Sequence, residues 1–160
     1  MQNSFERLGL PRRFAVDLAA LEQAYLDHSR AVHPDFHSAS VSSEQAASEQ
    51  AAAAVNEAYI TLKDPFRRAE HLLELLGGPA ASELKEIPAA FLMEMMELRE
   101  EIEAADSAGK ARLESAVRDR YSAVFAGIES LFEKDDLVAV RKELNAAKYL
   151  KGLLRDLRND

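Results

Sequence analysis

The sequence of 160 residues contains no cysteine and no tryptophan, and it has only 6 glycines and 5 prolines. The missing thiols exclude disulfide bonds, zinc fingers, iron–sulfur clusters held by thiolates, and cysteine nucleophiles. Alanine, leucine and glutamate are abundant, whereas residues that favour strands are sparse, so the composition favours helices over sheets. We therefore expect an all-α protein.

The sequence also has no basic half and no long apolar run. The net charge of −8 is spread evenly, with 7 basic and 11 acidic side chains in residues 1–76 and 13 and 17 in residues 77–160. Attraction to nucleic acid or to an anionic membrane surface is therefore not expected. No segment approaches the length of a membrane span, and residues 1–4 resemble neither a signal nor a transit peptide. The expected location is the cytoplasm.

Start and stop signals predict four helices in the first half, with approximate bounds 5–8, 18–33, 42–62 and 65–76. Asp17 and Asp64 suit the capping position before the second and fourth helices, and Pro34 ends the second. Helical spacing places one apolar stripe on the second helix and one on the third. The members of these stripes are Leu18, Leu21, Tyr25, Val32 and Ala51, Val55, Ala58, Leu62.

After a connector at residues 77–87, the second half is predicted to contain three longer helices. Their expected bounds are 88–105, 110–134, and from a cap at Asp135 or Asp136 to near the C-terminus. Short connections between long helices are typical of antiparallel bundles. We therefore expect a three-helix bundle over residues 88–160.

The tripeptide His33-Pro34-Asp35 occupies the turn between two helices. Pro34 restrains the backbone, and the Asp35 carboxylate suits a bidentate pair with an arginine of a partner. Polar groups held on an exposed loop are typical of recognition elements. In this setting, with the later Asn56-Glu57-Ala58-Tyr59, residues 1–76 resemble the J-domain, the module that stimulates ATP hydrolysis by Hsp70 chaperones. The preceding helix has Arg30 as its only basic residue, which favours a specialised Hsp70 partner.

Residues 91–103 carry more apolar side chains than one helical stripe needs. At about 100° per residue, Phe91, Met95, Leu98 and Ile102 form a core face, whereas Leu92, Met93 and Met96 form a second surface. On the last helix, Tyr149 and Leu153 are predicted to point away from the bundle core. An exposed patch of this kind suits a docking site, but burial of both sides is an equal alternative.

The segments Phe91-Leu92-Met93-Glu94 and Leu98-Arg99-Glu100-Glu101, behind a J-domain, closely resemble the HscB/Hsc20/Jac1 family of co-chaperones of iron–sulfur cluster biogenesis. The resemblance implies that His33, Pro34, Asp35 and Arg30 engage an Hsp70 of the HscA type. It also implies that a scaffold protein of the IscU type binds Leu92, Met93, Met96 and Tyr149, with Glu97 and Glu100 meeting basic residues of that scaffold. The chain would itself need no cofactor, and a bacterial cytoplasmic member is indicated.

The same residues give less support to other functions. A metal site at His28, His33 and His37 is not expected, because His28 and His33 are five residues apart and share no helix face. Nothing in the sequence pairs a nucleophile with a base or cradles a phosphate, so an enzyme is not expected. A general J-domain protein serving another client, and a structural helical module, stay open as alternatives.

Overall fold

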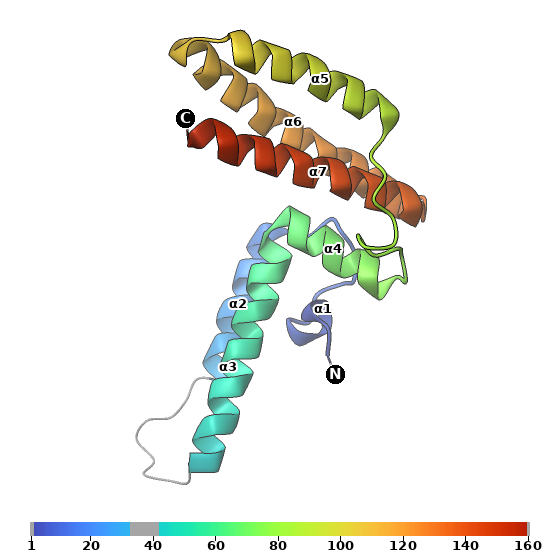
Figure 1. Ribbon diagram of the computed structural model, residues 1–160. Coiled ribbons are helices and arrows are strands. Elements are labelled where there is room, and N and C mark those ends of the chain that lie inside the picture. The colour runs from blue at the N-terminus through green and yellow to red at the C-terminus, as the bar shows by residue number, and fades with distance from the viewer. Residues whose placement is uncertain (1, 33–41, 160) are drawn as a thin grey trace. The chain divides into compact units, whose positions relative to one another are not determined.

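The computed structural model describes residues 2–32 and 42–159, and every regular element within these ranges is an α-helix. The all-α prediction is confirmed. The chain forms two compact units, Met1–Leu72 and Leu73–Asp160. None of the described helices is long and apolar enough to cross a membrane. Figure 1 shows the helices of both units.

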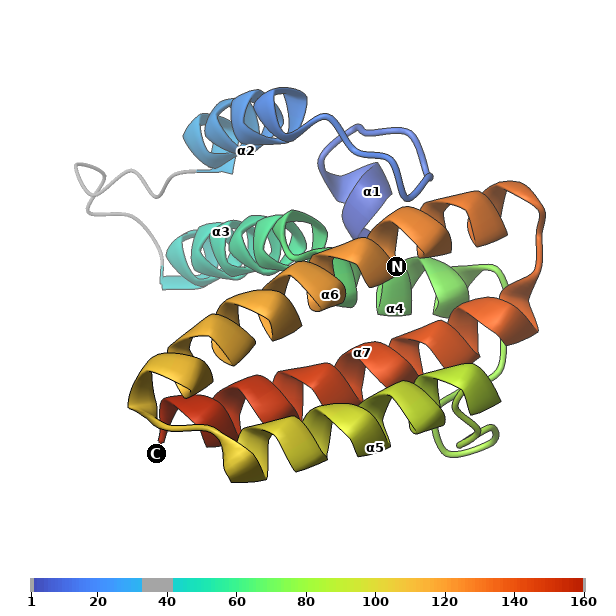
Figure 2. The ribbon, with the colours of Figure 1, turned by 90° about the horizontal axis from the view of Figure 1, so that it is seen from above.

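The first unit is built around a helical hairpin. Its helices are α1 (Ser4–Arg7), α2 (Leu18–Val32), α3 (Ser42–Lys63) and most of α4 (Pro65–Leu75). The predicted caps are confirmed, because the Asp17 and Asp64 carboxylates accept backbone hydrogen bonds from Ala19 and Arg67, each at 2.9 Å. Such caps satisfy N–H groups that the first helical turn leaves unpaired. The antiparallel pair α2 and α3 runs side by side in both views (Figures 1 and 2).

Four of the eight members of the predicted apolar stripes are buried, and three are half-buried, namely Tyr25, Val32 and Ala51. Among the described residues of the first unit, the buried apolar side chains are Phe5, Leu8, Phe14, Leu21, Val55, Ala58, Leu62, Ala69 and Leu72. The inward prediction for Leu18 is wrong, since 59% of this residue is exposed. Leu18 is the first residue of α2 and lies about 60° from Leu21 around the helix axis, at the edge of the stripe.

Helix α4 ends at two glycines, as predicted. Gly77 has a φ of 78°, a left-handed conformation that glycine adopts without steric cost. The Gly78 N–H donates to the Leu73 carbonyl at 2.9 Å, which closes the final turn. A Cβ atom at Gly78 would lie 2.2 Å from the Leu73 side chain, so this close approach also requires glycine.

The second unit contains the predicted three-helix bundle, formed by α5 (Ala89–Ala104), α6 (Ser107–Glu133) and α7 (Leu137–Arg158). Figure 2 shows the three long helices packed along one another. Helix α6 begins three residues before the predicted start at Lys110, because Asp106 caps it and accepts from the Gly109 N–H at 2.8 Å. Of the two candidate caps for α7, Asp136 accepts from the Ala139 N–H at 3.2 Å. Asp135 instead takes a φ of 58° in the turn.

Helix α7 is buried over a wider arc than a single stripe would cover. Its buried residues are Val140, Arg141, Leu144, Ala146, Ala147, Leu150, Leu153, Leu154 and Leu157. The prediction that Leu153 points away from the core is wrong, because only 7% of it is exposed. Buried residues therefore occupy more than one side of α7, which packs along α6 and also meets Phe91 of α5 through Tyr149.

Residues 79–86 are held against α7 by side-chain hydrogen bonds. The buried Arg141 donates from Nε to the Pro79 carbonyl at 2.9 Å. The Asn145 amide donates to the carbonyls of Leu84 at 3.0 Å and Glu86 at 2.9 Å. The segment that precedes α5 is therefore anchored to the last helix of the same unit.

We expect Asn145→Ala to destabilise the protein by about 1–2 kcal/mol, because two hydrogen bonds to carbonyl groups are lost. Urea unfolding followed by circular dichroism would measure the change. Lys148→Ala, on an exposed position of the same helix, serves as the matched control and should leave the free energy of unfolding within about 0.5 kcal/mol. Equal effects of the two substitutions would contradict the anchoring role of Asn145.

Candidate docking surface

The predicted Hsp70-binding loop, His33, Pro34 and Asp35, lies outside the described residues, as does His37. Arg30, which precedes this loop, is exposed in the last turn of α2. The Arg30 guanidinium lies 4.0 Å from the Asp27 carboxylate. An exposed pair at this distance contributes little to stability. The Hsp70-binding roles predicted for Arg30 and for the three loop residues therefore stay predictions.

A polar and aromatic seam holds α2 and α3 together. The rings of Tyr25 and Tyr59 stack with centroids 4.2 Å apart. The Tyr25 hydroxyl donates to the Asn56 side chain at 2.8 Å, and the Tyr59 hydroxyl donates to the Glu22 carboxylate at 2.5 Å. The hydrogen bond to Glu22 raises the pKa of Tyr59 above its ordinary value. These contacts fix the register of the hairpin.

Helix α5 presents two different apolar surfaces, as its spacing predicts. Phe91 and Met95 are buried in the bundle, and Leu98 and Ile102 are half-buried beside them. By contrast, Leu92, Met93 and Met96 are 47%, 66% and 65% exposed. None of these three side chains is buried in the bundle core. We call Leu92, Met93 and Met96 the α5 patch.

Tyr149 joins α7 to α5 at the edge of this surface. Its ring is half-buried and meets the buried Phe91 edge-to-face, with centroids 6.0 Å apart. The Arg99 guanidinium lies over the ring, 5.2 Å from its centroid, and its Nε donates to the tyrosine hydroxyl. The outward orientation predicted for Tyr149 is therefore only partly correct, because a helix packed on two sides leaves little of this position free.

Acidic side chains flank the α5 patch along the same helix. Glu97 and Glu100 are both exposed on α5, together with Glu101 and Glu103. Arg99 is the only basic residue of that helix. A surface with an apolar centre and a negative rim complements a partner with apolar side chains inside a basic surround.

A polar cluster beside Phe91 links all three bundle helices. Arg120 of α6 binds the Glu94 carboxylate of α5 through two hydrogen bonds, at 2.7 and 3.1 Å. Its guanidinium also lies 5.5 Å from the centroid of the Phe91 ring. Burial raises the pKa of the Glu143 carboxyl of α7, and the charge of Arg120 opposes this only in part.

Because the folded-state pKa of Glu143 is raised, its ionised form destabilises the native state at neutral pH. This cost falls as the pH drops through the folded-state pKa toward the unfolded value of about 4.3. We expect Glu143→Gln to stabilise the protein at pH 7, by less than about 1 kcal/mol because the group is only half-buried. The gain should shrink on acidification. Thermal unfolding between pH 7 and pH 4 would measure it, and a loss of stability at pH 7 would contradict the burial argument.

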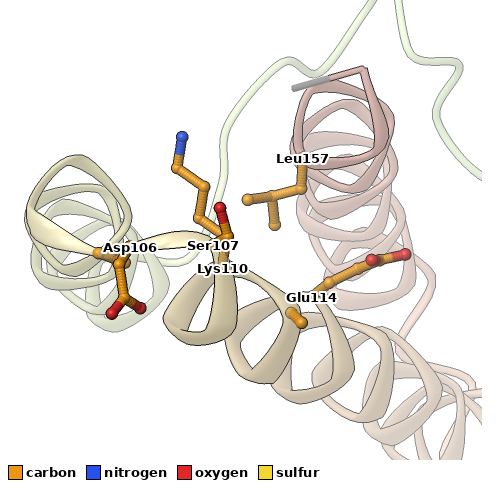
Figure 3. A pocket seen from close by; sticks show the side chains of 7 residues that line it. Asp106, Ser107, Lys110, Glu114 and Leu157 are labelled. Carbon is orange, nitrogen blue, oxygen red and sulfur yellow. The ribbon is translucent and has the colours of Figure 1, made fainter.

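A hollow of about 500 Å³ opens where α6 begins, between its first two turns and Leu157 of α7 (Figure 3). Asp106 caps α6 there, and Glu114 binds the guanidinium groups of Arg118 at 2.8 Å and Arg158 at 3.2 Å. The contact between Glu114 and Arg158 thus joins the start of α6 to the last turn of α7. Within residues 2–32 and 42–159, no three histidine, aspartate or glutamate side chains form a cluster able to hold a metal ion.

Comparison with known proteins finds relatives that match nearly the whole chain. Residues 87–158 match the family model described as the HSCB C-terminal oligomerisation domain. A curated relative, the co-chaperone protein HscB homolog of Aromatoleum aromaticum, is 36% identical over 98% of this chain and 92% of its own.

Solved structures of similar proteins superpose on almost the full length of this chain. The human co-chaperone HscB superposes with a TM-score of 0.85 at 31% identity, covering 99% of this chain and 81% of its own. HscB of Vibrio cholerae superposes with a TM-score of 0.80 at 30% identity, covering 99% of this chain and 96% of its own. The Jac1 co-chaperone of Saccharomyces cerevisiae, at 20% identity and a TM-score of 0.74, shares the fold.

The helical hairpin unit followed by a three-helix bundle is thus the architecture of a known class of co-chaperones. Within this class, the chain belongs to the HscB family. The family resemblance predicted from the sequence is confirmed.

Proposed function

We propose that this chain is a co-chaperone of iron–sulfur cluster biogenesis that binds a scaffold protein of the IscU type and delivers it to an Hsp70 of the HscA type. The observation that carries the proposal is the α5 patch, where Leu92, Met93 and Met96 stay exposed over a closed bundle core. Monomeric proteins seldom leave such large side chains clustered in water without a partner. Membership of the HscB family supports the same role.

In this proposal, the scaffold contacts the α5 patch and Tyr149, and its basic residues meet Glu97 and Glu100. Methionine side chains have several rotatable bonds and a polarisable sulfur, so they adapt to the shape of a partner. The acidic rim speeds association with a basic surface and selects against acidic proteins. Residues 88–160 would therefore form the scaffold-binding domain.

Residues 1–76 would form the J-domain, which contacts the Hsp70 through His33, Pro34 and Asp35, with Arg30 close by. Residues 77–87 would connect the two. Holding scaffold and chaperone on one chain raises their effective concentration toward each other. In this proposal, the chain performs no covalent chemistry and acts in the cytoplasm of a bacterium.

Isothermal titration of the full chain with an IscU-type scaffold tests the first half of this proposal. We expect a saturable complex that weakens as salt is raised, because screening reduces the attraction of the acidic rim for a basic partner. No heat of binding at low salt, with both proteins folded, would contradict scaffold binding and would favour a J-domain protein with another client.

A further inference from the structure

Arg99 and Tyr149 form a contact between two helices that core packing does not require. The guanidinium covers the tyrosine ring at 5.2 Å and hydrogen-bonds its hydroxyl through Nε. Buried Phe91 contacts the same ring edge-to-face. The ring of Tyr149 is therefore held from two directions, by an apolar neighbour from within the bundle and by a cation from its surface.

Arg99 also shares a strip of α5 with two members of the α5 patch. Leu92, Met96 and Arg99 follow one another at intervals of four and three residues, so they lie within about 60° of each other around the helix. The side chain of Arg99 extends this strip across to α7, where it ends on Tyr149. The arginine thus connects the α5 patch to the aromatic residue that the proposed scaffold site includes.

We infer that Arg99 is a positioning residue of the docking surface, which holds the ring of Tyr149 in the orientation that the scaffold meets. The inference rests on the proposed function. Arginine suits this task because its planar group stacks on an aromatic ring while donating a hydrogen bond at its edge. An exposed contact of this kind adds little to folding stability, and Arg99 is the single basic residue of an otherwise acidic helix.

A double-mutant cycle on scaffold affinity tests this inference with the full chain. We expect Arg99→Met to weaken binding about tenfold, because a ring ordered before binding costs less to immobilise. Tyr149→Phe keeps the ring and loses only the hydroxyl, so about a threefold loss is expected from weaker positioning. The double variant should bind no more weakly than Arg99→Met alone, because the hydroxyl acts only through Arg99.

Two further substitutions separate positioning from general effects. Arg99→Lys keeps the charge over the ring but loses the planar fork, so it should recover part of the affinity. Arg118→Met removes an exposed arginine of α6 that pairs with Glu114 and should bind like the wild type. The thermal midpoint of Arg99→Met should lie within about 2 °C of the wild-type value.

The outcomes distinguish this inference from the proposed function. Wild-type affinity in Arg99→Met, alongside lost binding in Leu92→Ala/Met96→Ala, would overturn the role of Arg99 and leave the scaffold site standing. Strictly additive effects of the two single variants would also overturn it, since Arg99 would then act independently of Tyr149. Absence of scaffold binding by the wild-type chain would instead refute the proposed function.

Discussion

Replacement of His33 by glutamine is expected to abolish stimulation of the Hsp70 ATPase while leaving the affinity for the scaffold unchanged. Glutamine keeps a polar side chain but cannot reproduce the imidazole ring. In the proposed mechanism this histidine, with Pro34 and Asp35, contacts only the chaperone. In the same proposal, the scaffold contacts α5 and α7, which belong to the other compact unit.

Steady-state ATP hydrolysis by an HscA-type Hsp70, measured with and without each variant, would check this result. His28→Gln is the matched control, because it makes the same chemical change on α2, five residues before His33. We expect His28→Gln to stimulate like the wild type. Full stimulation by His33→Gln would contradict the role of the loop, and loss of both chaperone and scaffold binding would contradict the two-site account.

The double variant Leu92→Ala/Met96→Ala should weaken scaffold binding by about 100-fold. Truncating an apolar side chain at the centre of an interface commonly costs more than 1 kcal/mol, and two such losses approach the 2.7 kcal/mol of a 100-fold change. Both side chains are exposed in the free chain. Their removal should therefore leave the free energy of unfolding almost unchanged.

Val138→Ala is the control for this prediction, because Val138 is an exposed apolar residue of α7 in the same unit. It should bind the scaffold with wild-type affinity. Titration calorimetry of the three proteins gives the comparison, with urea unfolding to verify that each is folded. Wild-type affinity in the double variant would mean that the scaffold binds elsewhere on the chain.

Much of the architecture could be predicted from local signals. Asp17 and Asp64 cap helices where the sequence predicts them, and Gly77 ends α4 in a left-handed conformation. The two faces of α5 also follow from residue spacing, since Phe91 is buried while Met93 is exposed. Helix caps and apolar periodicity depend on a few neighbouring residues, so both can be recognised in a single sequence.

The arrangement of α7 could not be predicted in the same way. The sequence predicts that Leu153 points away from the bundle core, but Leu153 is buried, and this burial depends on tertiary packing around α7. The contact between Arg99 and Tyr149 joins residues 50 positions apart. No local pattern marks such a pair, because its formation depends on the tertiary packing of α5 against α7.

In the proposed function, one chain couples a scaffold to an Hsp70. Steady-state ATPase activity of the HscA-type Hsp70, in the presence of the IscU-type scaffold and with or without this chain, tests this coupling. We expect a several-fold rise in hydrolysis that needs the chain and that His33→Gln cannot produce. An unchanged rate, with the chain folded and the Hsp70 active, would show that the chain does not couple the two proteins.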